Sequence, residues 1–308
     1  MLLLILRRLF HALFVIFAIS TIVFWVLRMS GDPVVLLLPQ DTTKEEIAAL
    51  RQAMGFNDPQ YIQYLRFLGK LTKGDLGHSF HYRQPALKLL LERMPATLQL
   101  TFAAMTFAIL IAIPLGILSA VKYATGLDTF SLGLATIGQS IPLFWLGLML
   151  MLVFSVFLRW FPTSGRGGWE HLILPAVTLG SYPMAAIVRL LRANMLTVLR
   201  MDYVTAARAK GVGEFWIVMK HAFKNAAIPV VTLIGLQVGV LFGGAVVTEV
   251  IFSWPGIGRL MVLAIYNRDF PLVQGGVILL AFVFVTVNLT VDLLYGYLDP
   301  RVRVGRSV

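Results

Sequence analysis

Long apolar runs alternate with polar stretches along the chain. A helix needs about 20 mostly apolar residues to cross a hydrocarbon core of about 30 Å, and six segments meet this requirement. They are residues 9–27, 96–121, 129–158, 174–199, 229–252 and 273–294. Because lipid offers backbone groups no hydrogen-bond partners, each segment is expected to be a helix. The pattern therefore predicts an all-α integral membrane protein with six transmembrane helices.

Two of these segments have particular features. Residues 9–27 are uninterrupted apolar sequence without a small-residue cleavage site, which is typical of a membrane anchor and not of a removable signal. Residues 129–158 are long enough to contain a break. Its candidates for helix packing or for lining a pathway are Gly138, Ser140, Pro142 and Trp145, and Gly147 lies just beyond them.

Small residues recur every fourth position in two spans. The first row is Ala104, Ala108, Ala112, Gly116 and Ala120, and the second is Gly235, Gly239 and Gly243. Such rows let helix backbones approach closely. The contact could lie within the chain or at an interface with a second subunit, and the pattern leaves both open.

The long polar stretch, residues 29–95, is predicted to be a small helical cap outside the membrane. Thr42 and Thr43 precede Glu45 and Glu46 in capping-box spacing. An amphipathic stretch at 61–71 and another segment at 85–93 follow. Between them lies the turn-like sequence Gly74, Asp75, Leu76 and Gly77. Such a cap could contact a partner, cover a pore mouth or be a packed structural insertion.

The second substantial polar stretch, residues 200–228, has apolar residues at helical spacing and basic residues on the opposite face. Gly211 and Gly213 interrupt the pattern, so two short helices meeting at a turn are expected. This loop could lie on anionic lipid, or it could dock into a cytoplasmic partner.

Composition and charge fix the class and the orientation. Apolar residues make up 58% of the chain and charged residues only 13%, about half the charged fraction of a soluble domain. This excludes a soluble enzyme and a disordered chain, and the lack of cysteine excludes a disulfide-stapled module. Basic residues outside the 29–95 segment number 13 on one side and five on the other. The positive-inside rule then predicts cytoplasmic N- and C-termini, and the net charge of +11 is not a nucleic-acid footprint.

Catalytic motifs are missing from the sequence. No GxxxxGK[ST], HExxH or GxSxG occurs, and the five histidines are scattered over different segments. We therefore expect no catalytic, cofactor-binding or metal-binding residues in this chain. Arg189 and Arg192 are expected to extend toward the headgroups. No charged residue lies clearly at a span's midpoint, which disfavours an ion-driven secondary transporter; a membrane-embedded enzyme and a scaffold or receptor are the other classes considered.

The loop at 200–228 resembles the EAA loop of ATP-binding-cassette importer permeases. Its form is similar to that of the dipeptide, oligopeptide and nickel branch, which reads DYxxTARAKG and then HAxxNAxxP. Thr205 replaces the acidic residue of the general motif, and His221 replaces an apolar one. The matching positions are Asp202, Tyr203, Ala206, Ala207, Arg208, Ala209, Lys210, Gly211, His221, Ala222, Asn225, Ala226 and Pro229.

An ordered series of other motifs extends the resemblance along nearly the whole chain. They are GDP at 31–33, GDLG at 74–77, PATLQL at 95–100, IPLGILSA at 113–120, FSWPGIGRL at 252–260, RDFPLVQGG at 268–276 and VDLLYGYLDPR at 291–301. These resemble the B-type permease of that branch. The short loop at 162–172 lacks an insertion that some dipeptide permeases carry, so glutathione-like, nickel-like and other peptide-type systems stay open.

The resemblance implies a type I importer permease fold and four regions. These are an N-terminal tail and first helix at 1–28, the outer cap at 29–95, a five-helix permease core at 96–298 and a cytoplasmic tail at 299–308. The loop at 200–228 would be the coupling loop. The chain would form half of a peptide pathway across the bacterial inner membrane, with import of nickel or a nickel chelate as the alternative.

The resemblance also implies partners. They are a second homologous permease, two ATPase subunits that hold the ATP and Mg, a substrate-binding protein outside and membrane lipid. No nucleic acid and no cofactor in this chain are expected.

Overall fold

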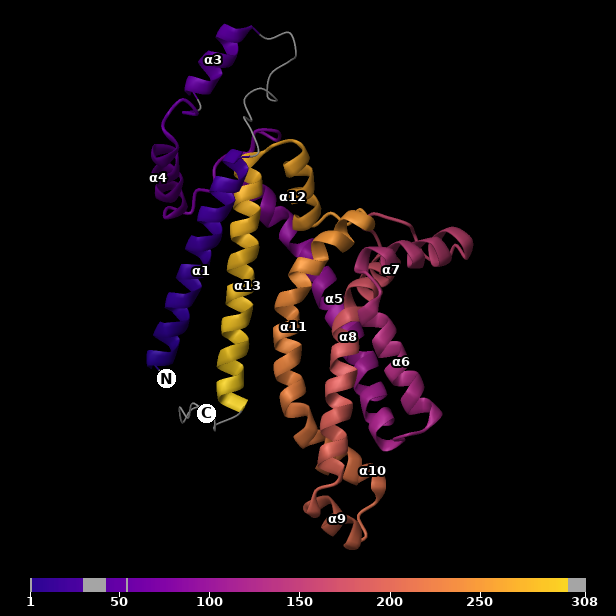
Figure 1. Cartoon of the computed structure of the whole chain (residues 1–308). Helices are drawn as coiled ribbons and strands as arrows, with labels where there is room; N and C mark the ends of the chain where they lie inside the picture. Colours follow the sequence, from indigo (N-terminus) through magenta and orange to yellow (C-terminus); the bar gives the residue numbers. More distant parts are fainter. Residues whose placement is uncertain (1, 30–42, 54, 299–308) are drawn as a thin grey trace. The chain divides into compact units, whose positions relative to one another are not determined.

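The structure, a computed structural model of the whole chain, describes residues 2–29, 43–53 and 55–298. These residues form helices joined by turns, apart from an isolated bridge between His78 and Pro85 (Figure 1). The helices are α1 (Leu2–Met29), α3 (Lys44–Ala53), α4 (Gln60–Leu71), α5 (Ala86–Val121), α6 (Gly126–Ser140), α7 (Leu143–Leu150), η1 (Met151–Phe157), α8 (Glu170–Leu199), α9 (Asp202–Ala209), α10 (Glu214–Trp216), η2 (Ile217–Phe223), α11 (Lys224–Ile251), α12 (Ile257–Tyr266) and α13 (Phe270–Leu298). The GDP motif and the tail at 299–308 lie outside the described residues.

Each predicted span falls on a helix. By length and composition, five helices of the described residues can cross a membrane, and α6 with Leu143–Phe157 makes a sixth if the pair counts as one span. That pair is bent by 108°, at Ile141 and Pro142. The break expected in the third segment is therefore confirmed. Pro142 explains its position, because proline has no N–H to continue the helix.

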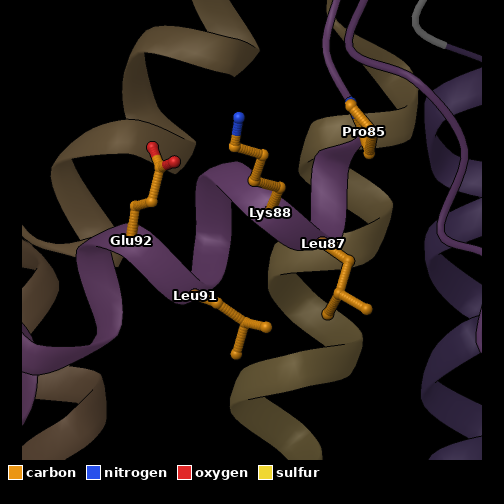
Figure 2. A pocket seen from close by; sticks show the side chains of 5 residues that line it. All are labelled: Pro85, Leu87, Lys88, Leu91 and Glu92. Atoms are coloured by element: carbon orange, nitrogen blue, oxygen red, sulfur yellow. The ribbon is translucent and has the colours of Figure 1, made fainter.

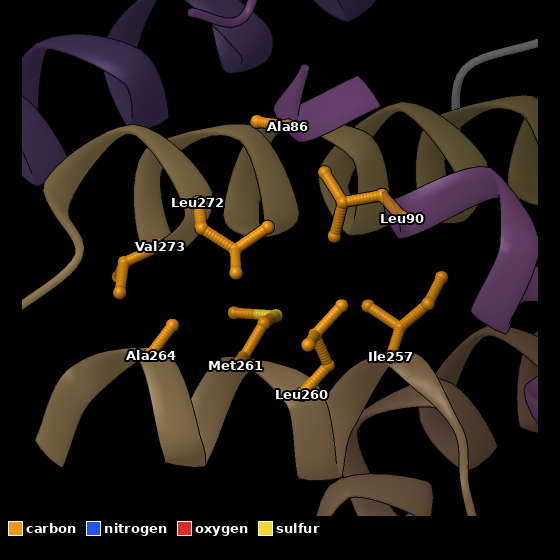
Figure 3. Close-up of a cluster of buried hydrophobic side chains, with 8 residues drawn as sticks. All are labelled: Ala86, Leu90, Ile257, Leu260, Met261, Ala264, Leu272 and Val273. Carbon is orange, nitrogen blue, oxygen red and sulfur yellow. The ribbon is translucent and has the colours of Figure 1, made fainter. Parts of the chain in front are cut away.

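The chain forms two compact units. The first comprises residues 1–97 and 255–285, and its apolar core lies where the start of α5, α12 and the start of α13 meet (Figure 3). Leu90, Ile257 and Leu272 are completely buried there. A Cβ on Gly276 would lie 2.6 Å from Met261, so α12 and α13 pack too closely for a larger residue.

Within the same unit, α4 packs against α1 and α3 does not contribute to a core. The hydroxyls of Thr21 and Tyr64 are hydrogen-bonded at 2.6 Å, and the Phe24 and Phe67 rings stack at 5.6 Å. None of the residues of α3 is buried. The capping box predicted for α3 is formed by Thr43, whose N–H donates to Glu46 at 3.0 Å while its Oγ1 accepts from the Glu46 N–H at 3.4 Å.

One helix joins the predicted cap to the first core span. Residues 85–93 were expected to belong to the outer cap, and α5 runs without interruption from Ala86 to Val121. The 95/96 boundary therefore lies inside a helix. Lys88, Glu92 and Arg93 lower the hydropathy of this stretch but lie on its exposed face, whereas Leu90 on the other face is buried.

The second unit comprises residues 98–254 and the chain from 286 onward. Half of the residues of α8 are buried, because α6 and α11 pack on it. The small-residue row of α5 faces α8: a Cβ on Gly180 would lie 2.5 Å from the Ala104 carbonyl oxygen. Of the two uses left open for this row, packing within the chain is the one that the structure shows.

Candidate coupling loop and membrane cavity

The loop after α8 forms one short helix, α9, and the turn that its glycines predicted. The second predicted short helix is instead the start of a continuous helical run, Glu214–Ile251, made of α10, η2 and α11. Helix α9 ends in a Schellman motif: the Gly211 N–H donates to Arg208 O at 2.9 Å, and the Val212 N–H donates to Ala207 O at 3.3 Å. Gly211 has a φ of 79°, a conformation that side chains with a Cβ rarely adopt. Gly213, at φ −59° and ψ 142°, begins α10. Figure 1 shows α9 and α10 together beyond the ends of α8 and α11.

An ion pair closes this turn. The Arg208 guanidinium donates two hydrogen bonds to the Glu214 carboxylate, at 2.7 and 3.1 Å. These bonds raise the pKa of Arg208 above its ordinary value, although desolvation opposes the shift. Both side chains are about half exposed, so the pair orients the turn more than it stabilises the fold.

A hydrogen-bond network joins α9 to the start of α11. The Asn225 amide donates to the Tyr203 hydroxyl at 2.8 Å and to the His221 carbonyl at 3.0 Å, and the Tyr203 hydroxyl donates to the same carbonyl at 3.2 Å. His221 thus contributes its backbone and not its imidazole. Beneath the network, Val204 and Ile217 are completely buried. Three residues that the resemblance singled out are therefore brought together.

The outward face of the loop is partly apolar. Asp202, Thr205, Ala206 and Lys210 are exposed. Beyond them lie two residues that the sequence reasoning did not select as a site, Phe215 and Trp216, which are 69% and 60% exposed. Their rings contact edge to face at 5.7 Å. The sequence does contain a sign of this site, namely two adjacent aromatic residues in a basic loop. Exposed apolar patches mark interaction sites.

A cavity of about 210 Å³ lies beside the helix break in the second unit. Its walls come from the break and from the middle of α8 and α11. The lining residues are Gly138, Ile141, Leu143, Leu179, Ser181, Tyr182, Pro183, Gln237, Val240, Leu241 and Gly244.

Of the pathway candidates predicted from the sequence, Gly138 lines this cavity and the others do not. Ser140 and Trp145 are exposed, and Pro142 begins α7. Gly235 packs against Val291, with 2.5 Å between a Cβ placed on it and the valine side chain.

The other two candidates on α11 differ from each other. Gly239 is buried, whereas Gly243 is exposed with open space around it. The second small-residue row therefore divides between packing within the chain and an open face.

The expectation for Arg192 was wrong. Its guanidinium does not extend freely toward the headgroups but forms a two-point ion pair with Asp128 of α6, at 2.7 and 2.8 Å. Asp128 is buried and also accepts from the Ser119 hydroxyl at 2.5 Å and from the Ala124 N–H at 3.0 Å. Asp128 lies 64 residues from Arg192, so local patterns could not reveal the pair. It joins the ends of α5, α6 and α8.

The predicted cap residues Gly74, Asp75, Leu76 and Gly77 form a tight turn in the first unit. The Asp75 carboxylate accepts a hydrogen bond from the Gly77 N–H at 2.8 Å. A Cβ placed on Gly275 would lie 3.2 Å from the Leu76 side chain. The turn thus packs against α13.

Asp269, which the sequence reasoning did not select, anchors the segment after this turn. Its buried carboxylate accepts from the Ser79 hydroxyl and from the N–H groups of Phe80, His81 and Leu272, at 3.1, 3.2 and 3.3 Å for the three N–H groups. This end of the cap is therefore structurally fixed.

A wider hollow of about 530 Å³ lies at the first turns of α5, and Figure 2 shows its lining of Pro85, Leu87, Lys88, Leu91 and Glu92. The Lys88 and Glu92 side chains point to one side of the helix and the two leucines to the other. All five residues belong to one short stretch and are exposed, so this hollow is a surface depression that cannot enclose a ligand.

Sequence comparisons decide the family. Residues 112–304 match the family described as binding-protein-dependent transport system inner membrane component, and residues 1–101 match its N-terminal region. The chain belongs to this family. It is a multi-pass inner-membrane component of an ATP-binding-cassette transport system, and such systems work with ATPase and substrate-binding subunits.

Similar proteins cover nearly the whole chain. The dipeptide transport system permease protein DppB of Alkalihalophilus pseudofirmus is 40% identical over 96% of this chain and 98% of its own length. The glutathione transport system permease protein GsiC of Escherichia coli K12 is 40% identical over 97% of this chain and 98% of its own. DppB of Escherichia coli K12 is 41% identical, with the same coverage.

Solved structures show the same fold. The inward-facing MetNI methionine transporter matches with a TM-score of 0.56 at 19% identity, over 69% of this chain and 97% of that chain. An amino acid ATP-binding-cassette transporter crystallised with histidines matches at 0.52 and 16% identity, over 70% and 94%. The fold is therefore that of importer permeases, as the resemblance implied.

Proposed function

We propose that this chain forms half of the pathway of an importer that moves peptides, either di- and oligopeptides or a glutathione-like peptide, into the cell. The observation that carries the proposal is the identity of about 40% with permeases named for dipeptide and glutathione transport, over nearly the full length of both chains. These names favour a peptide over nickel or a nickel chelate.

The proposed orientation places both termini and the loop at 200–228 in the cytoplasm. Its support is the excess of 13 basic residues over five once the outer segment is set aside. In this orientation the break between α6 and α7 lies along the path, and α3 and α4 lie outside.

ATP hydrolysis is assigned to partners. The sequence has no phosphate-binding loop, so two ATPase subunits would hold ATP and Mg²⁺, and this chain would neither bind a cofactor nor catalyse a reaction. The loop offers them a firm surface, because the Schellman turn and the Tyr203–Asn225 network fix its shape. Phe215 and Trp216 supply an exposed apolar contact.

A second, homologous permease would complete the pathway. Its proposed contact is the exposed face of α11, where Leu236, Val240, Gly243, Val247 and Val250 alternate at intervals of four and three residues. This spacing forms one continuous seam along a helix. Gly243 would let a facing backbone approach closely.

Transport would follow from differential contacts in two states. ATP closes the ATPase subunits and draws the two coupling loops together, and the attached helices rock from inward- to outward-facing. A binding protein docked on the outer cap delivers the peptide. Release of the hydrolysis products returns the helices to the inward-facing state.

The test is uptake by the full complex in proteoliposomes, with labelled dipeptide, tripeptide, glutathione and Ni²⁺ offered separately with their binding proteins. We expect ATP-dependent, vanadate-sensitive uptake of a peptide. Uptake driven by an ion gradient without ATP would indicate a secondary transporter, and ATP-dependent uptake of Ni²⁺ alone would indicate the metal branch.

A further inference from the structure

The cavity at the helix break lies beside the middle of two spans, and within its largely apolar lining Ser181, Tyr182 and Gln237 carry polar side chains. Gln237 is the fourteenth of the 28 residues of α11, and Pro183 is the fourteenth of the 30 residues of α8. Broken helices near the middle of a bilayer are where transporters hold their cargo. Non-helical backbone at that depth requires protein or water around it.

Backbone groups at the break have no partner among the described residues. The Ile141 N–H donates to Ile137 O, and the next recorded bond runs from the Leu146 N–H to Pro142 O. Between them, the carbonyls of residues 138–140 and the N–H groups of residues 143–145 are left over. Pro183 adds another acceptor, because a proline in a helix cannot bond the carbonyl four residues earlier, here that of Leu179.

The Gln237 side chain supplies an independent observation. It lines the cavity and is only 7% exposed, yet its amide has no hydrogen bond within the part of the chain that the structure describes. Its amide atoms are not fully enclosed by the protein, so they are accessible to a molecule in the cavity. An amide that lines a cavity and stays unpaired is suited to bond with whatever passes through.

The side chains that line the cavity indicate which kind of ligand it can hold. The lining has no charged side chain, and it offers an amide, the Tyr182 hydroxyl and free backbone groups, so it both donates and accepts hydrogen bonds. A volume of about 210 Å³ is smaller than the about 300–1,000 Å³ of clefts that enclose drug-sized ligands. It therefore fits one part of a peptide at a time.

We infer that this cavity is a contact site for the main chain of the transported peptide, with the Gln237 amide bonding a peptide N–H or C=O in passage. The inference rests on the proposed function and deepens it. Because every peptide has the same main-chain amides, the site recognises peptides irrespective of side-chain charge. Gly138 lets the break lie against α8, since a Cβ there would lie 3.2 Å from Ser181 O.

The experiment uses the complete transporter in proteoliposomes and measures peptide uptake per ATP hydrolysed. Gln237→Met keeps the volume and removes the amide. Gln274→Met is the matched control, because Gln274 is also buried, at 8% exposed, its Nε2 also has no hydrogen-bond partner among the described residues, and it does not line this cavity. Each is offered a labelled tripeptide and its analogue in which one main-chain amide is replaced by an ester, both at concentrations that saturate the binding protein.

We expect Gln237→Met to lower tripeptide uptake per ATP on the order of tenfold, the effect of one lost hydrogen bond of about 1.4 kcal/mol, and Gln274→Met to stay near wild type. The ester should slow the wild type but cause no further loss in Gln237→Met. Two results would overturn the inference: tripeptide uptake at the wild-type rate by Gln237→Met, or a loss of uptake caused by Gln237→Met that is equal for the tripeptide and for its ester analogue.

Two further outcomes are separable. If the wild-type complex takes up no peptide when ATP is supplied, both the proposed function and this inference are wrong. If Gln237→Met does not assemble, the wild type decides by itself: slower uptake of the ester supports the site, and equal uptake of ester and amide contradicts it.

Discussion

Gly211 and Gly213 lie two residues apart in the same turn, and both have open space where a Cβ would be. Only Gly211 has a positive φ, which closes α9 and sets the direction of α10. The requirement at Gly211 is therefore conformational and not one of space.

Replacing each of these glycines by serine separates the two effects. Gly211→Ser should strain the turn by about 1–2 kcal/mol and lower peptide uptake severalfold without affecting membrane insertion. Gly213→Ser should stay within twofold of wild type, because serine is favoured at a helix N-cap. Uptake by proteoliposomes at matched subunit levels measures both, and equal effects would argue against the turn.

The ion pair of Asp128 and Arg192 gives a second prediction at this scale. Breaking a fully buried pair costs about 3–5 kcal/mol, and because the Arg192 side chain is 18% exposed, Asp128→Asn should destabilise the chain by less than this. We expect a lower Tm in detergent. Asp128→Leu with Arg192→Met removes both charges and should recover much of the loss; a double variant as unstable as the single one would contradict the pairing.

At the scale of elements, α3 and α4 have separate roles in the outer cap. Helix α4 is bonded and stacked onto α1, whereas α3 buries nothing. Among the described residues α3 has no buried side chain, so within the outer cap we assign the proposed docking of the binding protein to α3.

Deletion of residues 44–53 should therefore weaken binding-protein docking several-fold while the Tm in detergent changes little. The control is Phe24→Ala, which should lower the Tm because it removes the ring that packs between α1 and α4. Binding of the substrate-loaded binding protein to the detergent-solubilised complex measures docking. Unchanged affinity after the deletion would make the cap purely structural.

Much at this scale was predictable from the sequence. Hydropathy located five spanning helices and the bent pair, the length of residues 129–158 indicated a break within it, and glycine spacing located the turn of the loop. Contacts between distant residues were not predictable: Asp269 bonds residues 79–81, and Asp128 bonds Arg192, each across more than 60 positions. The continuity of residues 86–95 with the following span was also not predicted, because charges on one helical face lowered the mean hydropathy.

At the scale of the molecule, the chain is one subunit of a larger transport complex. Its loop presents aromatic residues at one end, and the α11 seam has an open face at Gly243. Gly235 on the same helix is already covered by Val291.

Leucine at these two glycines should act differently. Gly243→Leu should leave the chain stable but block association with the second permease, seen as loss of co-purification. Gly235→Leu should destabilise the chain itself, because its side chain would overlap Val291. Normal co-purification of Gly243→Leu would move the subunit interface away from α11.

Residues 200–228 are proposed to dock on the ATPase subunits, and site-specific cross-linking can detect this contact because the chain has no cysteine of its own. A single Ala206→Cys, carrying a photoreactive reagent in the assembled complex, should label the ATPase subunit. Tyr266→Cys, at a position that is also exposed (80%) and is expected outside, should not. Absence of ATPase labelling from Ala206→Cys, or equal labelling from both positions, would contradict the account.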